Sequence, residues 1–156
     1  MATTWVVVAN SSAVSFFSVS GQEIKRIEQI DFPPGRERAS ELLSDKPGTT
    51  FDSMGEGRHS YSTEVDVHTH EQEVWAHQIA EKLRHAWDRQ EFQRLALIAP
   101  PDFLGELRQA IPNSVKKTIW KEVNKEIPNF LSEHEQKLRV SELLGLPFSP
   151  PTRKVH

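Results

Sequence analysis

The chain has 156 residues, a formal net charge of -3, 26% charged residues and no cysteine. This length fits one domain with a real hydrophobic core. The charge balance gives no reason to expect a partner that is a nucleic acid, DNA included, or a membrane, and the lack of cysteine excludes disulfides, zinc–thiolate sites and thiol catalysis. The first apolar run, residues 5–9, is too short for a signal sequence or a membrane span, so we expect a cytoplasmic protein.

Three β-prone runs open the chain. Residues 5–9 are almost continuously apolar, which is typical of a strand covered on both faces. Residues 13–19 and 22–32 follow after turn-forming residues, and in the third run Ile24 and Ile30 share one parity. We expect an antiparallel meander whose third, more polar strand lies near an edge of the sheet.

A long loop separates this meander from the clearest helix of the sequence. Residues 36–43 predict a short helix, and residues 44–67 are polar, punctuated by glycine and longer than ordinary connections. The helix is then expected from about residue 68 to residue 90. Its apolar stripe has helical spacing and consists of Trp75, Ile79, Leu83, Ala86 and Trp87.

The last third alternates between strands and helices. Residues 94–99 predict a buried strand, residues 102–111 an amphipathic helix bounded by prolines, and residues 132–144 a further short helix. Between them, residues 115–127 are ambiguous, because apolar residues recur every fourth position although 118–123 also has the composition of a strand.

This order of elements predicts an α/β fold. The expected architecture is a mixed β-sheet of about five strands, with an N-terminal antiparallel meander, then βαβ units, and helices on its faces. We expect residues 1–145 to form this single domain and residues 146–156 to form a flexible, proline-rich tail.

Histidines suggest a metal site, but their spacing argues against one. The candidates are His68, His70 and His77, and the last two lie two helical turns apart on the side opposite the apolar stripe. Zinc sites on helices pair histidines one turn apart and need a third ligand. A solvated helix face is the simpler interpretation, and no G-x-S-x-G elbow indicates a serine hydrolase.

Three stretches carry a resemblance to a known family. They are WVVVAN near the start, FPPGRERASELLSDKPGTTFDSMGEGRH with the helix after it, and APPDFLGELR at residues 99–108. Over residues 4–144 the chain resembles the bacterial family of host attachment proteins. That family is similar in turn to the middle domain of archaeal and eukaryotic peptide-chain release factors. The resemblance implies a release-factor middle-domain-like fold, with an exposed glycine-rich loop before the long helix and a strand at residues 118–124.

The resemblance also bears on chemistry. In release factors the loop carries Gly-Gly-Gln, which positions water at the peptidyl-tRNA ester. The corresponding stretch here is Gly55-Glu56-Gly57-Arg58-His59, which lacks both the glycine pair and the glutamine. A glutamate would bring negative charge to a developing oxyanion, which opposes the reaction.

The resemblance therefore implies a module that binds ribosome or tRNA through residues 44–67 without peptidyl-tRNA hydrolysis and without a cofactor. Glycines allow backbone N–H groups to approach phosphates, and cationic side chains attract them. One alternative is a hydrolase in which the loop is a lid and His59, His68 or His70 is a base or a metal ligand. Another is a host-cell attachment or signalling protein, which fits poorly with a chain lacking an export signal. The residues expected to contact RNA are Lys46, Asp52, Gly55, Gly57, Arg58 and His59.

Overall fold

The computed structural model describes the backbone of residues 3–35 and 57–146, and the side chains of these residues except 57–66. Its centre is a five-stranded sheet with the strand order β3-β2-β1-β4-β5. β1 pairs antiparallel with β2, as does β2 with β3, whereas β1–β4 and β4–β5 are parallel. The predicted mixed sheet and the edge position of the third strand are confirmed. The strands are β1 (Thr4–Ala9), β2 (Ala13–Ser20), β3 (Glu23–Asp31), β4 (Arg94–Ile98) and β5 (Ile119–Val123).

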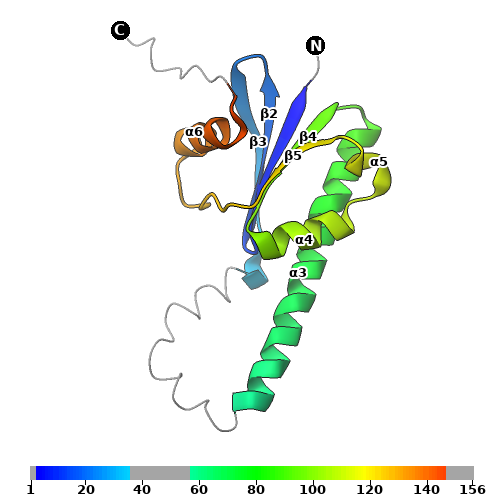
Figure 1. The fold of residues 1–156 in the computed structure, drawn as a ribbon, viewed down its shortest axis with the longest axis vertical. Coiled ribbons are helices and arrows are strands. Elements are labelled where there is room, and N and C mark those ends of the chain that lie inside the picture. Colours follow the sequence, from blue (N-terminus) through cyan, green and yellow to red (C-terminus); the bar gives the residue numbers. More distant parts are fainter. Residues whose placement is uncertain (1–2, 36–56, 147–156) are drawn as a thin grey trace.

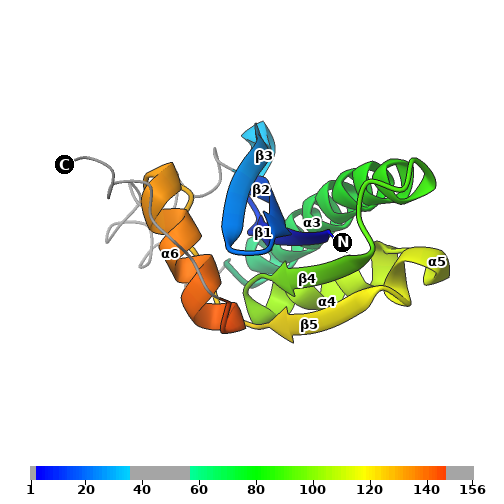
Figure 2. The same ribbon diagram turned by 90° about the horizontal axis from the view of Figure 1, so that it is seen from above.

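Helices cover both faces of the sheet (Figure 2). α3 (Gly57–Asp88), α4 (Pro101–Ala110) and α5 (Asn113–Lys116) lie on one face, and α6 (Glu133–Leu144) lies on the other. The central strand β1 is buried along its whole length, as its continuous apolar run predicts.

Two hydrophobic cores result, one on each face of the sheet. Trp5 and Val7 of β1 point into the core shared with α3 and α4, and the alternate residues Val6 and Val8 point into the core shared with α6. This is the two-residue period of a strand.

Irregularities in both edge strands interrupt that period. The pairing of β2 with β3 shifts so that Phe16 faces Glu28 and Phe17 faces Arg26, which leaves Ile27 as an extra residue. Residues on either side of such a bulge change faces. The shared parity of Ile24 and Ile30 was therefore a wrong guide to their faces, since Ile24 lies in the α6 core and Ile30 packs against the α3 core.

α3 begins eleven residues earlier than the sequence pattern indicates. Its first residue is Gly57, so residues 57–67 are helical although they were predicted as the last part of the loop. Figure 1 shows that this part of α3 runs past the ends of the strands, beyond the sheet and the other helices that the structure describes. A helix segment with nothing to pack against carries no apolar stripe.

The ambiguous region after α4 divides into α5 and β5. The strand implied by the resemblance is confirmed, and one continuous helix over residues 115–127 is wrong. The four-residue spacing does not describe one surface, since Val115 and Ile119 belong to the α3 core while Val123 and Ile127 belong to the α6 core.

Two further predictions lie outside the described residues, namely the short helix at 36–43 and the tail at 146–156 apart from its first residue, Leu146, which packs against the α6 core. Among the helices that the structure describes, none combines the length and apolar character needed to cross a membrane.

Candidate functional site

The candidate site is the end of the sheet from which α3 projects. β1 and β4 run parallel and finish at this end, and the first half of α3 extends beyond it (Figure 1). Open α/β sheets bind ligands outside the carboxyl ends of their parallel strands. Along residues 67–88 of α3, Trp75 is the first buried side chain, so the packed part of the helix starts there.

Trp75 fixes the direction of the projecting helix. Its indole Nε1 donates a hydrogen bond of 2.9 Å to the backbone carbonyl oxygen of Asn10 in the β1–β2 turn. Its ring also stacks on Phe32, with centroids 4.7 Å apart and an interplanar angle of 12°. Phe32 is tied to the same turn, because its backbone N–H donates to the carbonyl oxygen of Ser12 at 2.8 Å.

Gly35 brings the chain against this turn as well. A Cβ at this position would lie 1.8 Å from the carbonyl oxygen of Ser11, so only glycine fits. The chain before residue 36 and the packed part of α3 are therefore both held at the β1–β2 turn, the first through Phe32 and Gly35 and the second through Trp75.

Asn10 organises the polar rim of this end of the sheet. Its side-chain oxygen accepts hydrogen bonds from the backbone N–H groups of Ser12 and Ala13 at 2.9 and 3.0 Å. Its amide nitrogen donates to Glu126 at 3.1 Å and to Asn129 at 3.3 Å, both in the connection between β5 and α6. The sequence indicated only a turn at residues 10–12, and the Asn-Ser-Ser run is the signal that favours such an Asx turn.

The predicted RNA-contacting residues fall into two groups. Lys46, Asp52 and Gly55 lie outside the described residues. Gly57, Arg58 and His59 are the first three residues of α3, so its helical backbone brings them into one turn at the projecting end (Figure 1). The first turn of a helix has backbone N–H groups without partners inside the helix, and it carries partial positive charge.

The histidines considered as metal ligands do not converge. His70 and His77 are exposed on α3, and His68 is half-buried with its Nδ1 buried and without a hydrogen-bond partner. In the part of the chain that can be assessed, no group of three or more histidine, aspartate or glutamate side chains is placed to hold a metal. His77 lines a shallow polar groove of about 200 Å³ between α3 and α4, together with Glu73 and Glu106.

The outer face of α3 is an ordinary charged helix surface. Arg84 lies 3.0 Å from Glu81 and 3.3 Å from Asp88, one turn away on either side. The hydrogen bond and the charge of Arg84 lower the pKa of the Glu81 carboxyl, and the same contacts raise the pKa of Arg84. These charges satisfy one another, as expected for a solvated face.

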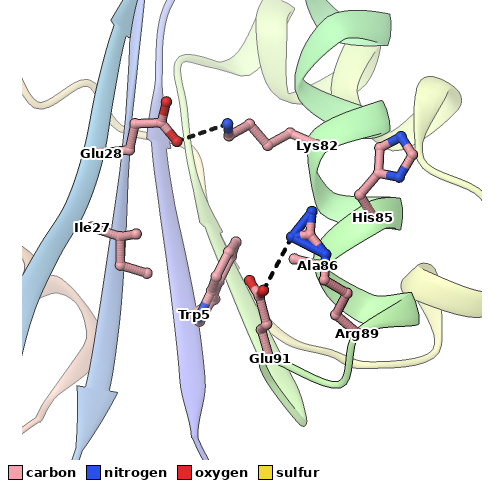
Figure 3. A pocket seen from close by; sticks show the side chains of 8 residues that line it. All are labelled: Trp5, Ile27, Glu28, Lys82, His85, Ala86, Arg89 and Glu91. Carbon is pink, nitrogen blue, oxygen red and sulfur yellow. Dashed lines mark hydrogen bonds and ion pairs between the residues drawn. The ribbon is translucent and has the colours of Figure 1, made fainter.

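A second hollow, of about 300 Å³, lies between the last turns of α3 and the sheet (Figure 3). Trp5, Ile27 and Ala86 provide its apolar wall. Its cationic side chains are paired with carboxylates, Lys82 with Glu28 at 2.7 Å and Arg89 with Glu91 at 3.3 Å. Pairing leaves these charged groups little to offer an anionic ligand. The pocket was not predicted, because its wall depends on the bulge that exposes Ile27.

Known structures resemble this chain only distantly. An archaeal protein shares 8% identity at a TM-score of 0.49, and the match covers 92% of this chain and 34% of the other. The archaeal translation termination factor aRF1 shares 7% identity at a TM-score of 0.45, with 80% of this chain and 30% of the other covered. Dom34 of S. cerevisiae, described as a translation termination-like factor involved in RNA quality control pathways and interacting with Hbs1, shares 11% identity at a TM-score of 0.40, with 92% and 35% covered. The chain thus spans about a third of each of these proteins.

The comparison with protein families is more specific. No curated protein matches the chain. A family model covering bacterial archaeo-eukaryotic release factors, family 12, matches residues 3–137. This match supports the release-factor side of the resemblance seen in the sequence, while the name host attachment protein is not confirmed by it. The chain belongs to bacterial archaeo-eukaryotic release factor family 12.

Proposed function

We propose that this chain is a release-factor-like module that contacts the ribosome or a tRNA through residues 44–67 and does not hydrolyse peptidyl-tRNA. The observation that carries the proposal is the projecting end of α3, which presents Gly57, Arg58 and His59 in the first helical turn beyond the end of the sheet. Family membership supports a partner in translation. We expect the protein to act in the cytoplasm, where ribosomes are.

The chemistry of this end suits a phosphate backbone. Arg58 contributes a permanent positive charge, and the helix start adds backbone N–H donors. Contacts of this kind position a protein on RNA without reading its sequence. The anchoring of α3 at Trp75 and Asn10 gives the projecting end a rigid base, so binding does not have to order the whole helix.

The proposed loss of hydrolysis rests on the resemblance to release factors. The stretch that corresponds to the Gly-Gly-Gln motif, residues 55–59, has no glycine pair and no glutamine, and it contains Glu56. A carboxylate there would repel the oxyanion that forms when water attacks the ester. The module would then keep the RNA contact of a release factor and lack its reaction.

Sedimentation of the tagged chain with ribosomes tests the binding. We expect the wild-type protein to travel with ribosomal fractions at low salt and to dissociate as the salt concentration rises. Arg58→Ala should weaken the association and reduce the slope of log affinity against log salt by about one unit. Arg84→Ala is the matched control, because Arg84 lies on the same helix but is already paired with Glu81. A wild-type chain that stays in the free fractions at low salt would contradict the proposal.

A peptide-release assay on ribosomes carrying peptidyl-tRNA tests the missing reaction. The wild-type chain should release peptide no faster than the uncatalysed background. Release well above background would overturn this half of the proposal and leave the binding half standing.

A further inference from the structure

A second surface with RNA-binding chemistry lies at the end of the sheet where β4 and β5 begin, opposite the end from which α3 projects. Trp120 is the second residue of the edge strand β5 and is 39% exposed. The pairing of β5 with β4 passes from Ile119 to Lys121, so Trp120 is the extra residue of a bulge. Bulges at sheet edges redirect a side chain away from the regular alternation.

Two cationic side chains lie close to this tryptophan, and two more lie on the segment before β5. The guanidinium of Arg94 lies 4.6 Å from the centroid of the Trp120 ring, and the ammonium of Lys121 lies 5.9 Å from it. Lys116 and Lys117 are exposed on the short segment that leads into β5. Arg94, Lys116, Lys117, Trp120 and Lys121 are called the Trp120 patch below.

The acidic residue next to this patch is already neutralised. Glu122 accepts a hydrogen bond of 2.9 Å from Arg108 of α4, and this contact raises the pKa of Arg108. None of the three lysines of the patch forms an ion pair within residues 3–35 and 67–146. Net positive charge therefore gathers here, on a chain whose overall charge is -3.

Core filling does not account for Trp120. Trp5 and Trp75, which do fill a core, are 6% and 2% exposed. Arg94 has a second contact that fixes its position, since its Nε donates to the Thr4 hydroxyl at 3.2 Å. The arrangement holds an indole partly open to solvent, with Arg94 and Lys121 beside it.

We infer that the Trp120 patch binds single-stranded RNA, with a base stacked on the indole and neighbouring phosphates at the lysines. Single-strand binders combine an aromatic platform with cations that follow the backbone. The patch lies at the end of the sheet where β4 and β5 begin, whereas α3 projects from the end where β4 finishes (Figure 1). The inference thus concerns a different surface from residues 44–67 and does not depend on them.

Fluorescence anisotropy with a labelled oligouridylate about twelve nucleotides long tests the inference. Trp120→Ala should weaken binding about tenfold, the loss expected for one stacked base. Phe130→Ala is the matched control, because Phe130 is an aromatic residue 83% exposed outside the patch. Lys121→Glu should weaken binding as well, whereas Lys25→Glu on the other edge strand should leave it unchanged.

A backbone of the same length without bases separates stacking from charge. The wild-type chain should bind this abasic oligomer about as weakly as Trp120→Ala binds the oligouridylate. Equal affinity of the wild-type and Trp120→Ala chains for the oligouridylate would overturn the inference, as would equal losses in Trp120→Ala and Phe130→Ala. The oligouridylate assay contains no ribosomes and compares variants of the Trp120 patch alone, so a failure of ribosome association and a failure of this patch are distinguishable.

Discussion

Trp75 and Asn10 show how much of the site depends on single contacts. The indole N–H of Trp75 meets a carbonyl oxygen that follows β1, and both groups are buried. Losing the donor would leave that acceptor without its partner in a place that water does not reach readily. The contact also joins the first packed turn of α3 to the turn that holds Phe32. The base of the projecting helix is therefore a hydrogen-bonded contact as well as an apolar one.

Trp75→Phe should lower the free energy of unfolding by roughly 1–3 kcal/mol, the cost of an unsatisfied buried acceptor. Urea denaturation followed by circular dichroism measures the change. Trp87→Phe is the control, because Trp87 contacts Phe92 through its ring and not the Asn10 carbonyl. If both variants lost the same stability, the hydrogen bond to Asn10 would have no particular role.

The sequence was a better guide to which residues are buried than to which face of the sheet they occupy. The apolar runs of β1 and β2 and the stripe of α3 all lie in the cores. Ile24 and Ile30 share one parity but lie on opposite faces of the sheet, because the extra residue Ile27 lies between them. A bulge depends on how an edge strand twists against its neighbour, and nothing in the residues 24–30 alone encodes that pairing.

Each of the two edge strands, β3 and β5, contains a bulge. Ile27 of β3 and Trp120 of β5 are each the extra residue of an irregular pairing, and each is an exposed large apolar side chain. Bulges interrupt a regular edge and discourage pairing with other chains. In β3 the bulge opens the hollow beside α3, and in β5 it presents Trp120 to solvent.

α3 shows the limit of periodicity as a guide to helices. The stripe from Trp75 onward was predicted because those residues face the sheet. Residues 57–67 gave no such signal, since glycine, serine and threonine interrupt the pattern there and this part of α3 extends beyond the described sheet. Gly57, Arg58 and His59 of the candidate site lie in this segment. The resemblance named these residues, but the sequence did not indicate their helical backbone.

α6 depends on its first turn, where Ser132 and Glu135 form a capping box. The Ser132 hydroxyl accepts from the Glu135 backbone N–H at 3.1 Å, and the Glu135 carboxylate accepts from the Ser132 backbone N–H at 3.4 Å. Ser132→Ala should lower the free energy of unfolding by about 1 kcal/mol. Urea denaturation can compare it with Ser114→Ala, a change at an exposed serine in α5. Equal stability of the two variants would mean that the cap contributes nothing.

Over the whole molecule, the sheet separates the two proposed binding surfaces. α3 projects from the end of the sheet where β1 and β4 finish, and the Trp120 patch lies at the end where β4 and β5 begin (Figure 1). The cores between them are filled by residues that take no part in either surface, such as Val7 and Leu97 on one face and Val6 on the other. Substitutions at the two ends should therefore act independently, as expected for distant sites without shared partners.

The body of the domain closes at Leu146. Gly145 ends α6 with a φ of 66°, which glycine adopts without strain, and the Leu146 backbone N–H then donates to the Ser141 carbonyl oxygen at 2.9 Å. Leu146 also packs against the α6 core beside Leu144, which is only 3% exposed. Leu146, which the sequence placed as the first residue of the tail, therefore belongs to the packed domain, and the proposed tail is residues 147–156.

A chain ending at Leu146 should have a free energy of unfolding within about 0.5 kcal/mol of that of the full chain. This is the range expected for changes that touch no packed or hydrogen-bonded group. Leu144→Ala in the full chain is the positive control and should cost roughly 2–5 kcal/mol, because it removes a buried side chain from the α6 core. Urea denaturation of the three proteins under one condition makes the comparison. A truncated chain that lost as much stability as Leu144→Ala would show that residues 147–156 belong to the folded body, and the proposed division into domain and tail would fall.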